Sequence, residues 1–415
     1  MVKFLPFDNP EFLNKNKTIT EIISPNKLFG FIRLMVKTVN KNKLPLHAYR
    51  CPKVNKLLFP IFNNWTEITI FSDEYYRGLK TGIYQYQILD SIKFGKKKIL
   101  KKVTIDIFKK KEKAEKENNK AIKQVQKICL NSLYGFWGLR TRDRDGVIIN
   151  KKNENSWLEH FHKGKLYNVL ESEQYTLMNI QRDLDVKTYN VAIAAAITSY
   201  SRTYLYDLIT DIQEAGGKVH YADTDSVMCD IDISKYPDIM KKYMWDGIDD
   251  LSKAGKELGS LKNEADEEFY STEALIAKKA GLSATLQKKA GKNFVKEQIK
   301  KDGGLIYFDK MILGGLKYYA LQRKIDGKTI EICKCKGYSK KDKKLRFIDF
   351  ENMINEKQIP ITQKQTQFKN PITNHLNKDN FMGICTQKVV KKFRVQYTKG
   401  IVDSKTNNIN TISVN

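Results

Sequence analysis

The chain has few of the residues that usually hold zinc. Its 415 residues include six cysteines and five histidines. No two cysteines form a Cys-x-x-Cys pair, which is the commonest spacing in structural zinc sites. Cys333 and Cys335 alternate with lysines, which is more typical of two ordinary residues on one face of a strand, and a zinc site there would need ligands from elsewhere. The sequence therefore does not favour a zinc-binding protein.

Long apolar segments are also missing. The sequence contains no run of about 18 apolar residues, the length that a membrane-spanning helix needs. The most apolar stretch, Val191 to Ile197, is far too short. The first residues have neither the uninterrupted apolar core of a secretory signal nor the composition of a transit peptide. These absences exclude a spanning helix, and the length suits roughly two to four folded domains.

The charge of the chain is strongly positive. Lysine and arginine number 74 against 47 acidic residues, which gives a formal net charge of +27 and a pI of about 9.5. The positive electrostatic field of such a chain suits a phosphate backbone, and neutralising the phosphates makes binding depend steeply on salt concentration. Anionic membrane surfaces would also attract it, but with no spanning segment we expect a nucleic acid as the partner and no membrane.

Two aspartates stand in a pattern typical of a β-hairpin tip. Val219 and Tyr221 alternate with polar residues upstream of Asp223 and Asp225, and a second alternating run follows from Val227. Two carboxylates so close repel each other unless a hard divalent cation, most commonly Mg²⁺, lies between them. Such pairs suit phosphoryl or nucleotidyl transfer. The alternative is an acidic, solvated turn, because aspartate and serine are common turn residues.

A lysine-rich segment precedes this hairpin in the chain. Its lysines recur at alternating steps of three and four residues, which predicts that all five lie on one face of a single helix. A stacked basic face needs an anion against it, such as a nucleoside triphosphate, although a solvated face is the simpler interpretation for the first members. The lysines are Lys113, Lys116, Lys120, Lys123 and Lys127.

Lys127 differs from the other four because it leads directly into polar and aromatic groups. Asn131 contributes an amide, Ser132 a hydroxyl and Tyr134 a flat ring, and Gly135 allows close backbone approach. These groups could hold a nucleotide. A tyrosine before a glycine is, however, also common where a helix ends.

Together these motifs carry a resemblance to a known family. Lys127-Ile-Cys-Leu-Asn-Ser-Leu-Tyr-Gly135 resembles motif B of the family B DNA polymerases, and Tyr221-Ala-Asp-Thr-Asp-Ser226 resembles their motif C. Lys317-Tyr-Tyr319 resembles the Lys-x-Tyr motif of the protein-primed branch, which occurs in phages and linear organellar plasmids. The long palm helix of that branch is similar to Val191–Arg202, and its lysine-glycine element to Lys334–Gly337.

The resemblance implies a role for each matching residue. Asp223 and Asp225 would be the catalytic metal ligands for Mg²⁺ or Mn²⁺. Lys127 would bind the triphosphate. Asn131 and Tyr134 would hold and select the incoming deoxynucleotide, and Lys317 and Tyr319 would steady the primer terminus on the DNA. The implied partners are a DNA template-primer, deoxynucleoside triphosphates and a terminal protein that acts as primer.

The implied fold is α+β, a right-hand polymerase fold with a partial palm, helical fingers, a small thumb and inserted subdomains. Within the first region, the clearest predicted strands are residues 28–39 and 83–94, with a turn at Gly95. Residues 265–310 have helical spacing but no counterpart in the family pattern. The expected regions are residues 1–100 (partial palm and first insertion), 101–140 (fingers), 141–187 (second insertion), 188–345 (palm) and 346–415 (thumb).

One family element is not found in this sequence. Motif A, an Asp-x-x-Ser-Leu-Tyr-Pro segment that supplies a further carboxylate, should precede motif B, and the exonuclease domain should precede motif A. The chain instead opens with residues that read like the stretch just beyond motif A. We therefore expect this chain to bind primed DNA but to extend it poorly unless the front segment is supplied.

Two functions follow from these observations. The first is a DNA-directed DNA polymerase that uses two metal ions and protein priming to replicate a linear mitochondrial plasmid or its integrated copy. The second is a non-catalytic DNA-binding remnant of such an enzyme. The abundance of lysine, asparagine and isoleucine indicates an AT-rich gene, which agrees with coding inside a mitochondrion.

Overall fold

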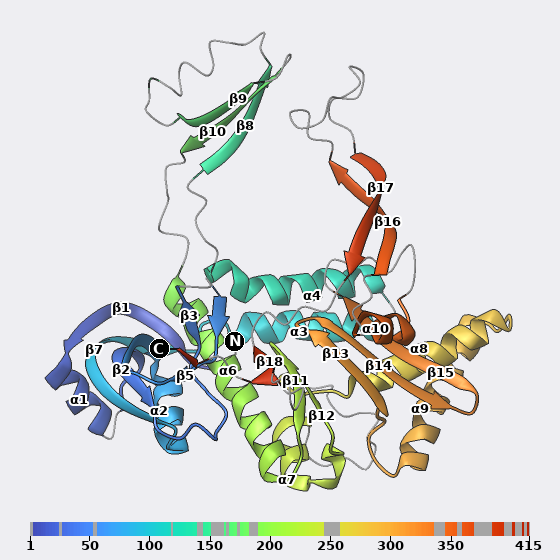
Figure 1. Cartoon of the computed structure of the whole chain (residues 1–415), viewed down its shortest axis with the longest axis horizontal. Coiled ribbons are helices and arrows are strands. Elements are labelled where there is room, and N and C mark those ends of the chain that lie inside the picture. Colours follow the sequence, from blue (N-terminus) through green and yellow to red (C-terminus); the bar gives the residue numbers. More distant parts are fainter. Residues whose placement is uncertain are drawn as a thin grey trace.

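The computed structural model combines helices with antiparallel sheets. Figure 1 places a four-stranded sheet at the left, a long helix near the centre, and a three-stranded sheet beside a helical pair at the right. This mixture agrees with the predicted α+β class. The described residues are 3–24, 27–52, 56–117, 119–138, 144–150, 162, 166–171, 175–181, 190–244, 258–335, 345–354, 359–368, 384–393, 401–402, 409–410 and 413–414.

The first region is built on an antiparallel sheet in the order β1-β7-β2-β6. Ile32, Leu34 and Val36 of β2 are fully buried, because side chains two residues apart share one face of a strand. Strands β2 and β7 confirm the two predicted strands. The elements are β1 (Leu5–Asn14), α1 (Lys15–Ile23), β2 (Gly30–Thr38), β3 (Tyr49–Cys51), β4 (Lys56–Leu58), β5 (Ile61–Phe62), β6 (Thr66–Phe71), α2 (Ser72–Thr81) and β7 (Tyr84–Lys97).

The turn predicted at Gly95 is wrong, since Gly95 lies inside β7 opposite Phe7 of β1. The register of β1 shifts just after Phe7, which brings Asp8 towards β7. A Cβ atom on Gly95 would lie 2.9 Å from Asp8 Oδ2 and 3.2 Å from the Phe7 carbonyl oxygen. The glycine is therefore needed for a close strand contact rather than for a turn.

Helix α6 (Val191–Glu214) confirms the predicted long helix and runs through the middle of the molecule (Figure 1). Its first half packs Ile193 and Ile197 against the N-terminal sheet through Phe71. Its second half packs Leu208 and Ile212 in a separate cluster. The helix thus joins the first region to the aspartate hairpin, whose strands contribute side chains to the second cluster.

A buried polar cluster also ties α2 to α6. Glu74 of α2 is fully buried. Its Oε2 accepts hydrogen bonds from Ser199 at 3.0 Å and from Arg202 at 2.8 Å, and its Oε1 lies 3.0 Å from His47 Nδ1. The other His47 ring nitrogen lies 2.7 Å from the Tyr86 hydroxyl. Burial disfavours the charged carboxylate, but His47 and Arg202 together hold the pKa of Glu74 below its ordinary value.

The prediction that five lysines share one face of a single helix is wrong. The chain forms two helices, α3 (Lys101–Lys116) and α4 (Lys120–Gly135), packed side by side (Figure 1). The second helix begins anew because the Asn119 side chain accepts a hydrogen bond from the Ile122 N–H at 3.0 Å, which caps its first turn. Lys113 and Lys116 therefore end α3, while Lys120, Lys123 and Lys127 belong to α4.

The remaining elements build the second half of the chain. Strands β13, β14 and β15 form an antiparallel sheet in that order, against which α10 packs through Phe350. Cys333 and Cys335 lie on β15, as the strand interpretation expected. The elements are η1 (Phe136–Gly138), β8 (Arg144–Asn150), β9 (Leu166–Glu171), β10 (Tyr175–Gln181), β11 (Val219–Asp223), β12 (Ser226–Cys229), η4 (Ile233–Lys235), α7 (Pro237–Ile239), the π-helix η5 (Met240–Met244), α8 (Glu264–Lys279), α9 (Ala284–Asp302), β13 (Lys310–Gly315), β14 (Tyr318–Ile325), β15 (Lys328–Cys335), α10 (Phe347–Ile354), β16 (Ile359–Phe368), β17 (Ile384–Phe393), β18 (Ile401–Val402), β19 (Ile409–Asn410) and β20 (Ser413–Val414).

The five regions expected from the sequence stay a prediction. The helical spacing predicted over residues 265–310 is confirmed by α8 and α9. Large parts of the expected second insertion (141–187) and thumb (346–415), and Gly337 of the lysine-glycine element, lie outside the described residues.

Candidate active site at the aspartate hairpin

The two aspartates lie where the sequence predicted, at the tip of an antiparallel hairpin. Strands β11 and β12 pair so that Asp223 stands opposite Ser226, with Thr224 and Asp225 as the turn. Thr224 takes a φ of 58°, in the left-handed region. The Asp225 N–H donates to the Asp223 carbonyl at 2.6 Å, and the Ser226 hydroxyl donates to the same oxygen at 3.1 Å. The turn therefore holds both carboxylates at one end of the sheet.

The two carboxylates differ in their surroundings. The Asp223 side chain is 24 % exposed, accepts a hydrogen bond from the Thr224 hydroxyl at 3.0 Å, and lies 3.5 Å from the Lys317 ammonium. Asp225 is exposed. One carboxylate is thus partly neutralised by a lysine, and the other is open to solvent and to a ligand.

The structure brings the predicted Lys-x-Tyr motif to this hairpin. Lys317 occupies the turn between β13 and β14 with a φ of 58°, and its N–H donates to the Tyr221 hydroxyl at 2.9 Å. The Tyr221 ring lies 5.4 Å from the Tyr319 ring. Asp223, Lys317 and Tyr319 therefore form one cluster, although the motifs are far apart in the sequence.

Two members of this cluster were not predicted as site residues. Tyr221 precedes Asp223 by two residues on the same strand, so its position on the same face could have been inferred from the period of a strand. Lys334 lies across from Tyr319 in the β14–β15 pairing, and its ammonium lies 5.6 Å from that ring centre. Only the register of the two strands reveals the second contact.

The electrostatics of the cluster favour the charged form of Lys334 and the neutral form of Tyr221. Burial disfavours the Lys334 ammonium, but its hydrogen bond with Tyr319 and the charge of Glu264, 3.8 Å away, raise its pKa overall. Burial also raises the pKa of Tyr221, and the hydrogen bond from the Lys317 N–H to the Tyr221 hydroxyl partly opposes that rise. At neutral pH the tyrosine is a neutral hydroxyl and the lysine is charged.

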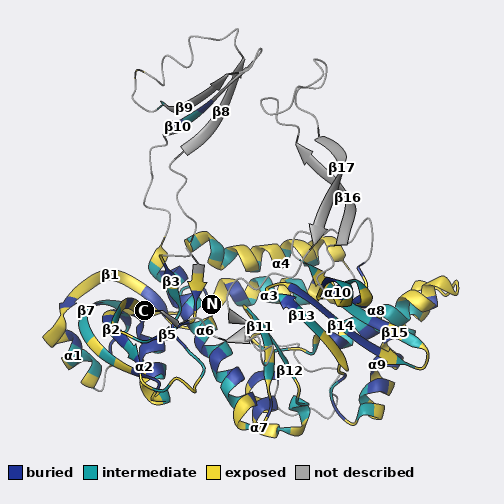
Figure 2. Ribbon diagram, in the orientation of Figure 1, coloured by how far each residue is buried: buried dark blue, intermediate teal, exposed yellow. Residues whose placement is uncertain are grey.

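The predicted nucleotide-binding residues lie together on α4. Lys127, Asn131 and Tyr134 are four and three residues apart, which puts them on one face of the helix, and all three are exposed. Figure 2 shows how much of α4 is exposed. Among the described residues no hydrogen bond or ion pair joins these three to the aspartate hairpin. Structure and sequence therefore agree on a shared face of α4 and give no direct contact between the two motifs.

Lys127 also lies within electrostatic reach of helix α8. The pKa of Glu267 on α8 is lowered chiefly by its hydrogen bond with Lys262 at 2.6 Å, and further by the charges of Lys123 and Lys127. The basic face of α4 and the first turn of α8 are therefore close enough to interact electrostatically.

The hairpin fits a divalent metal that is shared with a substrate. Mg²⁺ is usually held by one or two carboxylates together with substrate phosphates and water, rather than by a complete protein cage. Asp223 and Asp225 supply two such carboxylates. The part of the chain that the structure describes contains no group of three or more His, Cys, Asp or Glu side chains arranged for a metal.

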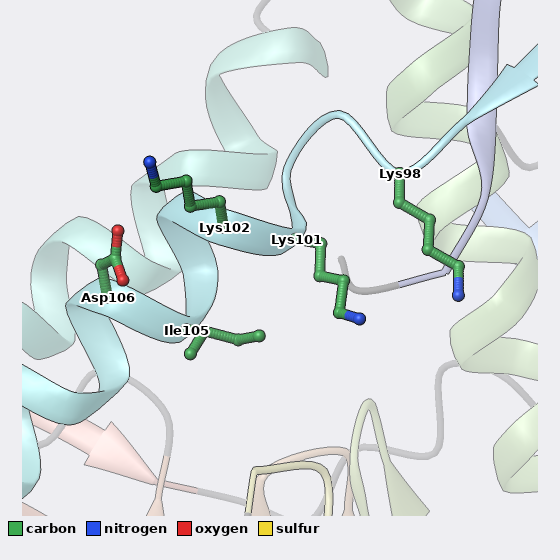
Figure 3. Close-up of a pocket in the computed structure, with 5 residues that line it drawn as sticks. All are labelled: Lys98, Lys101, Lys102, Ile105 and Asp106. Atoms are coloured by element: carbon green, nitrogen blue, oxygen red, sulfur yellow. The ribbon is translucent and has the colours of Figure 1, made fainter.

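A shallow cavity of about 380 Å³ lies apart from these residues, at the start of α3. Figure 3 shows the side chains that line it: Lys98, Lys101, Lys102, Ile105 and Asp106. The Lys98 ammonium also lies 4.8 Å from the centre of the Phe4 ring. None of the predicted site residues lines this cavity, so it adds a basic surface but no part of the aspartate site.

A comparison with one solved structure supports the fold. Phi29 DNA polymerase complexed with primer-template DNA and incoming nucleotide substrates matches with a TM-score of 0.50 at 16% identity, covering 95% of this chain and 55% of that chain. At this identity the likeness concerns the fold alone, and it agrees with the predicted right-hand polymerase fold. An orthorhombic crystal form of phi29 DNA polymerase gives a TM-score of 0.49 at 17% identity, covering 87% of this chain and 53% of that chain.

Two curated relatives match half of the chain or more. A probable DNA polymerase of Neurospora intermedia is 26% identical over 356 residues, covering 82% of this chain and 29% of the relative. A probable DNA polymerase of Podospora anserina is 26% identical over 239 residues, covering 50% and 19%. The chain thus spans less than a third of the length of either relative.

No helix in the described part of the chain has the length and apolar character needed to cross a bilayer.

The sequence model of the DNA polymerase type B family, organellar and viral, matches residues 1–215, which include α4 and α6 and end before Asp223. Because this match covers more than half of the chain, the protein belongs to the organellar and viral type B DNA polymerases.

Proposed function

We propose that the chain is a catalytic part of a DNA-directed DNA polymerase, which adds deoxynucleotides to a primer by nucleotidyl transfer. The observation that carries the proposal is the cluster of Asp223, Lys317 and Tyr319 around one hairpin. Carboxylates that can hold a metal ion and a cationic side chain suit a reaction on the phosphates of a nucleic-acid strand. Family membership supports the same activity.

Each residue has a positioning role in the proposed reaction. Asp223 and Asp225 would hold Mg²⁺ or Mn²⁺, which when bound would neutralise charge on the reacting phosphates. Lys317 and Tyr319 would hold the primer terminus so that its hydroxyl meets the α-phosphate. On α4, Lys127 would contact the triphosphate, and Asn131 and Tyr134 would orient the incoming deoxynucleotide. Catalysis of phosphoryl transfer rests mainly on such positioning and charge neutralisation.

The ion pair between Lys317 and Asp223 has a place in this proposal. The Lys317 ammonium partly neutralises Asp223, which is the less exposed of the two carboxylates. Asp223 and Asp225 would hold the cation, and the Lys317 ammonium would contact an anionic primer phosphate. Lys317 would therefore serve both the carboxylate pair and the nucleic acid.

The biological setting is a further part of the proposal. Protein priming by a terminal protein, replication of a linear mitochondrial plasmid and a mitochondrial location are supported by the organellar and viral type of the family and by the Lys-x-Tyr motif. The fungal relatives named as probable DNA polymerases are compatible with it.

A second candidate is a DNA-binding protein without catalysis. It is favoured by the ligand set, since the described residues bring two carboxylates and no third His, Cys, Asp or Glu group to the site. The net charge of +27 would serve DNA binding in either case.

Primer extension distinguishes the two candidates. The purified chain is mixed with a primed template, deoxynucleotides and Mg²⁺ or Mn²⁺, with and without an added segment that carries motif A, and its DNA affinity is measured in parallel. For a polymerase we expect extension when that segment is added, and we expect Asp225→Asn to abolish it while DNA affinity is kept. DNA binding without extension even when the segment is added would reject the catalytic proposal in favour of the second candidate.

A further inference from the structure

The helical pair α8–α9 carries a regular basic stripe that the proposed active site does not use. On α9, Lys288, Lys292, Lys296 and Lys300 recur every four residues and are all exposed. This spacing puts them on one face of the helix, one turn apart. The opposite face is buried and contains Gly291, Phe294, Val295 and Gln298.

The stripe has little compensating charge. From Lys278 to Lys301 the sequence contains eight lysines and one acidic residue, Glu297. Within the described ranges, only Lys301 of these eight pairs with a carboxylate, that of Asp326 at 3.3 Å. Lysines four residues apart on a helix repel each other. An anionic partner along the stripe would remove this repulsion.

The stripe is held rigidly against the sheet that begins at the active site. Phe269 of α8 stacks on Phe294 of α9 with ring centres 6.1 Å apart, and both pack on Ile330 of β15. Arg323 of β14 donates two hydrogen bonds of 2.7 Å to Asp302, and both side chains are almost buried. The stripe therefore keeps a fixed orientation relative to β14, which starts directly after Lys317.

We propose that the lysine stripe of α9 binds the phosphate backbone of duplex DNA behind the primer terminus. This inference rests on the proposed function, because the duplex would be the one held at Lys317 and Tyr319. Twelve helical residues span about 18 Å. Duplex DNA carries roughly ten phosphate charges over that length.

The composition of the stripe favours duplex DNA over other anions. Single-stranded nucleic acid is usually held by aromatic rings that stack on bases, and no aromatic residue stands between the stripe lysines on this face. A helix that lies in a membrane surface buries its apolar face in lipid. The apolar face of α9 is instead occupied by Phe269 and the rest of the pair's own core.

The salt dependence of DNA binding tests the proposal. We compare Lys288→Gln/Lys292→Gln/Lys296→Gln with the control Lys15→Gln/Lys17→Gln/Lys41→Gln, which removes three exposed lysines far from α9. Anisotropy of labelled duplex DNA is measured across salt concentrations, without nucleotides or divalent metal. The stripe variant should bind more weakly and lower the log–log salt slope by about 2.7, roughly 0.9 for each lost phosphate contact, and the control should bind as the wild type does.

A triple Lys→Arg variant at the same positions should restore both affinity and slope, since it keeps the charge. Circular dichroism checks that each variant is folded. Equal slopes for the stripe and control variants would overturn the proposal. So would a loss of binding to anionic phospholipid vesicles with duplex binding unchanged. If the stripe variant lowers the slope and the chain extends no primer even with the motif A segment added, the stripe proposal stands and catalysis is rejected. Extension with an unchanged slope would reject the stripe alone.

Discussion

Two carboxylate clusters in this protein differ in how far their negative charge is buried and paired. Glu74 is fully buried, and both of its oxygens are taken up by His47, Ser199 and Arg202. Asp223 lies at a hairpin tip with its side chain 24 % exposed, and among the described residues it pairs with Thr224 and, more loosely, with Lys317. The first cluster joins α2 to α6, and the second leaves oxygen atoms free for a ligand.

Removing a carboxylate should have different consequences in the two clusters. A buried charge without its partners is costly, so every partner of Glu74 contributes to folding. The hairpin carboxylates are near solvent, so losing one changes the fold little and changes ligand binding greatly. We therefore expect mutations in the first cluster to act on stability and mutations in the second to act on binding.

The largest expected effect is on stability. Glu74→Ala leaves His47 and Arg202 without their carboxylate, and breaking a buried pair in this way costs about 3–5 kcal/mol in the free energy of unfolding. Urea unfolding measures the change. The control is Glu67→Ala, whose carboxylate pairs with Arg33 at the surface and should cost no more than about 1 kcal/mol. Equal losses would show that burial of the Glu74 cluster adds nothing.

The pH dependence of stability follows from the lowered pKa of Glu74. A carboxyl group whose folded pKa is depressed stabilises the fold above its unfolded value, 4.5 for glutamate here, and that contribution is lost as the pH falls through the folded pKa. The stability gap between the wild type and Glu74→Gln should therefore shrink below about pH 4.5. A gap that stays constant down to acid unfolding would contradict the role of the ionised carboxylate.

The second cluster is tested by metal binding. Asp225→Asn should weaken Mn²⁺ binding by at least about tenfold, because even outer partners of metal ligands are worth about 10–100-fold in affinity. The matched control is Asp230→Asn, at the other end of the same hairpin, where the carboxylate accepts the Lys218 N–H at 2.6 Å. Isothermal titration gives both affinities. If the two variants bind Mn²⁺ equally, the tip is not the metal site.

The last prediction compares the two helices of the lysine-rich segment. Lys127→Ala on α4 should weaken deoxynucleotide binding by about 1.5–3 kcal/mol if its ammonium meets the triphosphate. Lys113→Ala on α3 removes a lysine that is 77% exposed and 3.9 Å from Glu117, and should cost less than about 1 kcal/mol. Fluorescent nucleotide titration measures both. If the two losses are indistinguishable, Lys127 contributes only to the general positive charge of the surface and makes no specific contact with the triphosphate.

Local sequence patterns predicted much of this structure, and they failed where one pattern is compatible with two different structures. The alternation around Asp223 predicted the hairpin because it depends on neighbours in sequence, and the resemblance of Val191–Arg202 to the family's long palm helix predicted α6. The lysine spacing continued in phase from Lys113 to Lys127 across the Asn119 cap, so periodicity alone could not separate one helix from two. Gly95 marked a close strand contact, which a sequence pattern cannot distinguish from a turn.

The sequence by itself determined which groups are present and how they are spaced along each element: the two carboxylates at the hairpin, the row formed by Lys127, Asn131 and Tyr134, and the basic charge. Hydrogen bonding within a turn, strand or helix sets these positions over a few residues. Only the tertiary structure decided that Lys317 reaches Asp223 and that Glu74 meets Arg202. Such contacts depend on packing between distant segments, which no local pattern records.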